Sequence, residues 1–99
     1  MDERIYLMDL YDLYEKLLND KQREYFKCYY FDNLSLGEIS ELLNVSRNAV
    51  HKNIKLVDNK LKDYESKLNL YEKNITLEKV INTIEDNKLK RELEKLRWW

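Results

Sequence analysis

Apolar positions along this chain recur at steps of three and four, the period of an amphipathic helix. The first run predicts a helix over most of residues 1–18, with apolar positions at Leu7, Leu10, Tyr11, Tyr14, Leu17 and Leu18. Asn19 and Asp20 then supply a break and a cap. A second helix is predicted through KQREYFKCYYF, whose aromatic face consists of Tyr25, Phe26, Tyr29 and Tyr30. Aromatic residues at helical spacing usually fill interiors, so this face is expected to be core.

A short helix, a tight corner and a longer helix are predicted between about residues 35 and 60. Ser35 and Glu38 have the spacing of a capping box, which begins a short helix with Ile39, Leu42 and Leu43 on its apolar side. Asn44 tolerates a left-handed backbone and stands where that helix must turn. Ser46 is a good N-cap for the helix that follows. This order of elements is the sequence form of a helix-turn-helix.

The helix after Ser46 has an extended apolar seam. Its steps are 4, 3, 4, 3, 4 and 3, through Val50, Ile54, Val57, Leu61, Tyr64, Leu68 and Tyr71. With no breaker between Arg47 and Glu72, one helix of roughly 39 Å is predicted. Three helices cannot cover all of that length. The distal half, from about Leu61, is therefore expected to pack against the chain's own tail or a second copy.

The tail is predicted to be a helical extension over about residues 76–99. Residues 72–76, EKNIT, have the composition of a linker, and Thr76 can cap the last helix. A change of step near Asp86 predicts a kink or two short helices. Trp98 and Trp99 either anchor another surface or fold onto the domain. With no proline and one glycine, the chain lacks the turn residues that sheets need, so residues 1–99 are predicted to form a single all-α domain.

Charge is concentrated locally, although the net charge is only −1. Residues 1–20 contain six acids and two bases, whereas residues 46–62 contain five bases and one acid. With Val50 at zero on a helical wheel, Asn48, Lys52, Lys55 and Asn59 fall between roughly 140° and 200°, opposite the apolar seam. Arg47 and His51 lie on the flank of that outward strip.

These groups suit contacts with nucleic acid. Asn pairs with adenine, Arg with guanine, and Lys with guanine or phosphate. Ser46 and the free amides of the helix N-terminus can hold a phosphate. The candidate nucleic-acid-binding residues are therefore Ser46, Arg47, Asn48, His51, Lys52, Lys55 and Asn59. The alternative is a solvated helix face, the usual fate of charged residues.

A family resemblance lies in the same stretch. The segment EISELLNVSRNAVHKNIK resembles the helix-turn-helix of region 4 of bacterial sigma-70-type factors, with Ser40 where many members have alanine and Asn44 where many have glycine. From about Leu17 to Tyr71 the chain is similar to the YlxM-like helix-turn-helix proteins of bacteria. The resemblance implies a small cytoplasmic helical DNA-binding regulator, linked by gene neighbourhood to the signal recognition particle pathway.

Other chemistries lack the residues they need. No glycine-rich phosphate loop or paired nucleophile and base is present, so no enzymatic activity, small-molecule substrate or cofactor is expected. His51 is the only histidine and has no cysteine nearby, which excludes it as a structural zinc ligand. Cys28 lies among aromatic residues and is expected to be a small core residue. No stretch is apolar for long enough to span a membrane, so a cytoplasmic location is expected.

Three functional hypotheses remain. The preferred one is a regulator that binds duplex DNA as a homodimer, because a dimer presents two basic patches to two half-sites. The second is a structured RNA or ribonucleoprotein partner, as the family link to the signal recognition particle suggests. The third is a protein-interaction module that uses the aromatic face, the acidic first helix and the two tryptophans.

Overall fold

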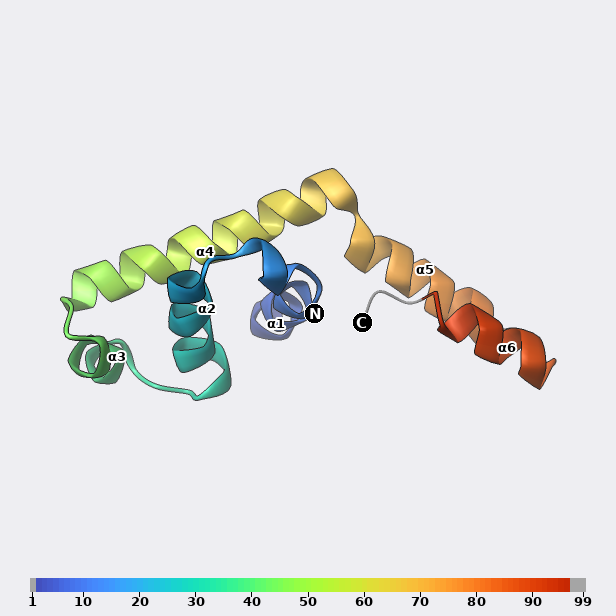
Figure 1. The fold of residues 1–99 in the computed structure, drawn as a ribbon, viewed down its shortest axis with the longest axis horizontal. Coiled ribbons are helices and arrows are strands. Elements are labelled where there is room, and N and C mark those ends of the chain that lie inside the picture. Colours follow the sequence, from blue (N-terminus) through green and yellow to red (C-terminus); the bar gives the residue numbers. More distant parts are fainter. Residues whose placement is uncertain (1, 97–99) are drawn as a thin grey trace.

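The structure is a computed structural model that describes residues 2–96, and these residues form helices and connecting turns without a strand (Figure 1). The prediction of an all-α fold is confirmed. The α-helices are α1 (Glu3–Tyr14), α2 (Asp20–Phe26), α3 (Leu36–Leu43), α4 (Arg47–Leu68), α5 (Leu70–Asn82) and α6 (Asn87–Glu94). A 3₁₀ turn at Glu15–Leu17 follows α1, and a π-helical turn at Lys27–Phe31 continues α2.

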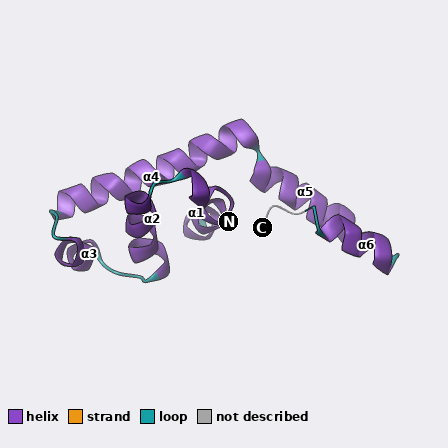
Figure 2. Cartoon of the chain, in the orientation of Figure 1, coloured by secondary structure: helices purple, strands orange, loops and turns teal. Residues whose placement is uncertain are grey.

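The long helix α4 organises the fold. Helices α1, α2 and α3 all contact α4, and α5 and α6 extend from its far end (Figures 1 and 2). The molecule is consequently elongated, measuring 54 × 25 × 24 Å along its principal axes. The α3–α4 corner lies at one end of the long axis, and α6 lies at the other.

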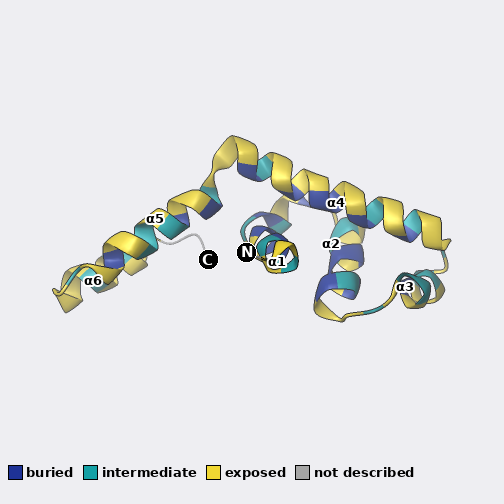
Figure 3. Ribbon diagram, turned by 180° about the vertical axis from the view of Figure 1, so that it is seen from behind, coloured by how far each residue is buried: buried dark blue, intermediate teal, exposed yellow. Residues whose placement is uncertain are grey.

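The core lies between α4 and the three helices packed against it. Figure 3 shows the buried side of α4 turned toward α1 and α2, with exposed positions on its outer side. The first four seam positions of α4, Val50, Ile54, Val57 and Leu61, are buried as predicted. Further along the helix Tyr64 is half-buried and Leu68 is 44% exposed, so the seam is not buried to the end of α4. The aromatic face of the second helix is also core, since Tyr25, Phe26 and Tyr30 are buried and Tyr29 is half-buried. Cys28 is a buried free thiol, and burial raises its pKa.

The predicted N-caps of the second and third helices are present. Asn19 and Gln22 form a capping box at the start of α2, and Ser35 and Glu38 form another at the start of α3. The two hydrogen bonds with Ser35 lower the pKa of Glu38. These local hydrogen bonds satisfy amides that a helix N-terminus otherwise leaves unpaired, so they fix where α2 and α3 begin.

The predicted end of the long helix is wrong. Helix α4 stops at Leu68 because Asn69 adopts a left-handed backbone with φ 57°. Helix α5 begins directly at Leu70, so residues 72–76 are helical rather than a linker, and Thr76 lies inside α5 rather than capping it. Asparagine adopts this conformation more readily than most residues, and it reverses the chain without glycine.

The sequence predicts that the distal half of α4 packs against the tail or a second copy. In the structure α1 packs against it instead. Tyr14 of α1 lies 5.9 Å from Tyr64, measured between ring centroids, and Lys62 pairs with Glu3. The acidic first helix therefore neutralises one lysine of the basic segment. The expected break near Asp86 is confirmed, since Asp86 caps α6 and separates it from α5. Trp98 and Trp99 lie outside the described residues.

Candidate nucleic-acid interface

The corner between α3 and α4 is held by side chains on both sides of the turn. Asn44 ends α3 with φ 56°, in the left-handed region. The Ser40 hydroxyl donates a hydrogen bond to the Val45 carbonyl at 2.6 Å, and the Val45 amide donates to the Ser40 carbonyl at 3.1 Å. The serine found where alanine is common thus adds a hydrogen bond across the corner, which helps to fix the direction in which α4 leaves α3.

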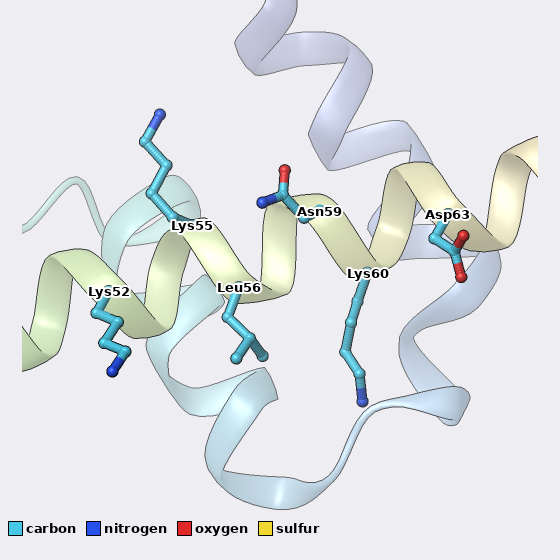
Figure 4. A pocket seen from close by; sticks show the side chains of 6 residues that line it. All are labelled: Lys52, Lys55, Leu56, Asn59, Lys60 and Asp63. Atoms are coloured by element: carbon cyan, nitrogen blue, oxygen red, sulfur yellow. The ribbon is translucent and has the colours of Figure 1, made fainter.

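The predicted strip is exposed to solvent along its whole length. All seven candidate residues are exposed, namely Ser46, Arg47, Asn48, His51, Lys52, Lys55 and Asn59. The Ser46 hydroxyl accepts a hydrogen bond from the Ala49 amide at 3.1 Å, as predicted for an N-cap. Figure 4 shows Lys52, Lys55 and Asn59 extending from the outer surface of α4. The structure therefore brings the predicted residues together on one accessible surface, which we call the basic strip.

Arg47 is oriented differently from the lysines of the strip. A Cβ atom placed on Gly37 would lie 2.6 Å from the Arg47 Nη2 atom. The guanidinium group therefore lies over the start of α3, in space left by the only glycine of the chain. Gly37 allows this close approach, so Arg47 connects the first turns of α3 and α4 on the outer side of the corner.

The basic strip retains its positive charge. None of the ion pairs found among residues 2–96 involves Arg47, Lys52 or Lys55. Lys62, in contrast, pairs with Glu3 at 2.5 Å, and its pKa is raised chiefly by the hydrogen bond with that carboxylate. Partnered lysines offer less charge to a ligand, so the available charge is concentrated in the first half of α4.

Sequence reasoning missed two residues beside the strip, Leu56 and Lys60. Leu56 is 44% exposed, although it is a leucine, and it lies between Lys52 and Lys60 in Figure 4. These three side chains line a shallow groove together with Lys55, Asn59 and Asp63. Their wheel positions, next to the outward strip, would have predicted this placement. An exposed leucine among cations adds an apolar contact to the surface, of the kind that a thymine methyl group accepts.

Asp58 is the first acid after the strip, and it points into the protein. It is 7% exposed, and its Oδ2 atom accepts a hydrogen bond from the Tyr30 hydroxyl at 2.8 Å. Burial raises the pKa of the Asp58 carboxyl, against the opposing effects of the Tyr30 hydrogen bond and of Lys55 and Lys62. Burial likewise raises the pKa of Tyr30 above its usual range. Because Asp58 is turned inward, the exposed carboxylate of the groove that Lys55 lines comes from Asp63, two turns further along α4.

Replacing Asp58 with asparagine should change how stability depends on pH. A raised pKa means that the native state binds the proton more tightly than the unfolded chain. The free energy of unfolding of the parent therefore falls as pH rises from the unfolded pKa to the folded one. Asp58→Asn removes this loss, so the free energy of unfolding of the variant should rise relative to that of the parent between pH 4 and pH 7. Urea unfolding at both pH values measures the difference.

Tyr30→Phe is the matched control for that experiment. It removes the hydroxyl that donates to Asp58 and leaves the carboxylate buried without this bond. The control should therefore lose stability at pH 7, where Asp58→Asn does not. An asparagine variant that loses as much stability at pH 7 as the phenylalanine variant would contradict the raised pKa.

Comparison with known proteins agrees with the helix-turn-helix formed by α3 and α4. The family model described as "UPF0122: Putative helix-turn-helix protein, YlxM / p13 like" matches residues 1–97. The chain belongs to this family. A UPF0122 protein of Clostridium botulinum (strain Alaska E43 / Type E3) is 47% identical over 91 residues, which are 91% of this chain and 84% of the relative. A UPF0122 protein of Oceanobacillus iheyensis is 49% identical over 73 residues, which are 74% of this chain and 70% of the relative.

The UPF0122 match extends the resemblance noted for residues 17–71 to nearly the whole chain. It includes the whole of α5 and α6, so the family match covers these helices together with the helix-turn-helix. Among residues 2–96, no helix is long and apolar enough to cross a membrane. The same residues contain no group of three His, Cys, Asp or Glu side chains placed to hold a metal ion.

Proposed function

We propose that this UPF0122 protein is a cytoplasmic regulator that binds duplex DNA, with the first half of α4 placed in the major groove. The observation that supports this most is the basic strip: cations and amides without ion pairs, exposed on the second helix of a helix-turn-helix. Helix-turn-helix proteins place this second helix in the major groove, with its N-terminal residues at the base edges. Short helix α3 would then cross the DNA backbone.

The length of the strip assigns roles to its residues. Asn48 and Lys55 are about 10 Å apart along α4 at 1.5 Å per residue, which fits a major groove about 12 Å wide. We assign Asn48, His51 and Lys52 to base edges, because they belong to the first two turns. Asn59 lies about 16 Å from Asn48 along the helix and reaches the groove edge, where it contacts phosphate or sugar.

The start of α4 supplies the phosphate contacts. Free amides at a helix N-terminus attract anions, and no acid occurs in the first turn of α4 to compete with a phosphate. Ser46 and Arg47 stand at this end, and the Arg47 guanidinium also reaches α3. Phosphate bound here would fix the register of the helix in the groove. In a homodimer, each protomer would bind one of two half-sites in this way.

Salt dependence tests the proposal directly. Three cations in each protomer, Arg47, Lys52 and Lys55, would each displace a counterion from the DNA. The logarithm of the binding constant should then fall with the logarithm of salt concentration with a slope of about −3 per protomer. Fluorescence anisotropy of labelled random-sequence duplex, measured at several salt concentrations, gives this slope.

Measuring the affinity for a folded RNA hairpin at the same salt concentration distinguishes DNA binding from RNA binding. The major groove of A-form RNA is too narrow for a helix such as α4, so duplex DNA should bind more tightly than the hairpin. Tighter binding of the hairpin would favour the ribonucleoprotein hypothesis linked to the signal recognition particle. Binding of neither nucleic acid at low salt would favour the protein-interaction hypothesis.

A further inference from the structure

Helices α5 and α6, residues 70–96, form an arm on which three apolar side chains are exposed, although Tyr71 and Ile81 are buried. Val80, Leu89 and Leu96 are 49%, 50% and 63% exposed. Leu89, Leu93 and Leu96 follow one another at steps of four and three, which places them on one face of α6 and its last turn. No residue of α6 is buried. The arm therefore presents Val80, Leu89 and Leu96 to solvent, with the half-buried Leu93 between the two leucines on the same face.

The shortness of α6 makes such a surface costly. The helix has eight residues, whereas isolated helices shorter than about 12–15 residues are marginal in water. Its Asp86 cap stabilises the first turn but buries no apolar area. Most helical stability in proteins comes from packing of an apolar face. Helix α6 contacts α5 on one side, and the row of leucines needs a second surface.

Charge indicates which surface that is. A two-fold interface brings a patch against itself, so a patch with a large net charge repels its own copy. The arm contains six acids and six bases over residues 70–96 and is neutral. The basic strip and the acidic first helix each have an excess of one sign. Pairing the acidic first helix of one copy with the basic strip of another would join two different surfaces. Each copy would then keep one of these surfaces free to bind a further copy.

We propose that the arm of one protomer pairs with the arm of a second copy, so that α5 and α6 form the interface of a two-fold homodimer. The leucine row of each α6 would be covered by the apolar side chains of the partner arm. The interspersed acids and bases around the row would then meet opposite charges across the axis. Because the α3–α4 corner lies at the other end of the molecule, this interface leaves the basic strip accessible (Figure 1).

The test is the mass of the full chain in solution. Sedimentation equilibrium from about 1 µM to about 300 µM covers the affinities of weak and moderate protein complexes. The parent should shift from 12.2 kDa to twice that mass as concentration rises. Leu89→Glu combined with Leu96→Glu should weaken dimerisation at least 100-fold. At least half of each side chain is exposed, so the substitutions leave the core intact. Circular dichroism should therefore still show the α1–α4 helices.

The matched control places the same substitutions elsewhere. Leu17 and Leu42 are 53% and 63% exposed and lie outside the arm, so Leu17→Glu combined with Leu42→Glu should dimerise like the parent. Val80→Glu, on α5, should weaken the dimer as the α6 variant does. A parent that stays monomeric, or arm variants that dimerise normally, would overturn the proposal. The inference extends the homodimer of the proposed function, and because no nucleic acid is present, its failure is separate from a failure to bind DNA.

Discussion

Lys52→Glu combined with Lys55→Glu is expected to reduce affinity for duplex DNA by more than 100-fold. Both lysines are exposed on the outer face of α4 and form no ion pair with a residue among 2–96. Each substitution removes a phosphate-neutralising cation and adds an anion that the DNA repels. The thermal midpoint should stay within a few degrees of the parent, because surface substitutions usually change stability by less than about 0.5 kcal/mol. Anisotropy titration at fixed salt measures the loss.

The control for this experiment changes net charge by the same amount on another surface. Lys16, in the 3₁₀ turn after α1, and Lys21, in the first turn of α2, are exposed and belong to neither α3 nor α4. Lys16→Glu combined with Lys21→Glu should weaken binding far less than the strip variant. Equal losses in the two variants would mean that overall charge, rather than the basic strip, determines affinity. Unchanged binding by the strip variant would rule out this face as the contact surface.

Local signals in the sequence determined much of the helix-turn-helix. The caps at Asn19, Ser35 and Ser46 each involve a partner two or three residues away, so their spacing is visible without a structure. The left-handed Asn44 follows from a short apolar run that ends at a residue tolerant of positive φ. Exposure of the basic strip follows from the helical period alone, once the buried side of α4 is known.

Contacts between distant residues explain what the sequence did not predict. Asp58 and Glu65 are acids, a residue type that is seldom buried, yet both are buried. Their partners, Tyr30 and Tyr14, are 28 and 51 residues away along the chain. Period and spacing do not show such pairings, because they depend on how whole helices pack. The same holds for Arg47, whose place on the wheel gives its direction but not its contact with Gly37.

The end of α4 shows how such a contact decides between similar local signals. Asn69 lies within the predicted long helix and Asn74 within the predicted linker, but only Asn69 adopts positive φ. A buried carboxylate lies four residues before it, where Glu65 accepts hydrogen bonds from the amides of the new helix α5. The amides of Tyr71 and Glu72 are thus satisfied by α4, and the Leu70 amide donates to the Tyr14 hydroxyl of α1. The chain can therefore turn at Asn69 without leaving these amides unpaired. Apolar spacing gave no sign of this, since the seam continues through Tyr71.

Glu65→Ala is expected to lower the free energy of unfolding by about 3 kcal/mol, since it leaves several buried polar groups without their partner. The Glu65 carboxylate is 6% exposed and accepts hydrogen bonds from the Tyr14 hydroxyl at 2.6 Å and the Tyr71 amide at 3.0 Å. It also accepts from the Glu72 amide at 3.3 Å. This one side chain therefore joins α1, α4 and α5. Urea unfolding followed by circular dichroism measures the loss, which is large beside a typical stability of 5–15 kcal/mol.

Two variants separate the hydrogen bonds of Glu65 from its volume. Glu65→Gln keeps an oxygen for the Tyr14 hydroxyl and should cost less than the alanine variant. Tyr14→Phe removes the hydroxyl, which also accepts a hydrogen bond from the Leu70 amide at 3.1 Å, and should cost about 1–2 kcal/mol. DNA binding by the folded fraction should be unchanged in all three, because Glu65 lies on the distal half of α4, beyond the basic strip. Unfolding of Glu65→Ala at the same urea concentration as the parent would show that this junction contributes little, and that α5 is held to the core by the Tyr6–Tyr71 ring contact instead.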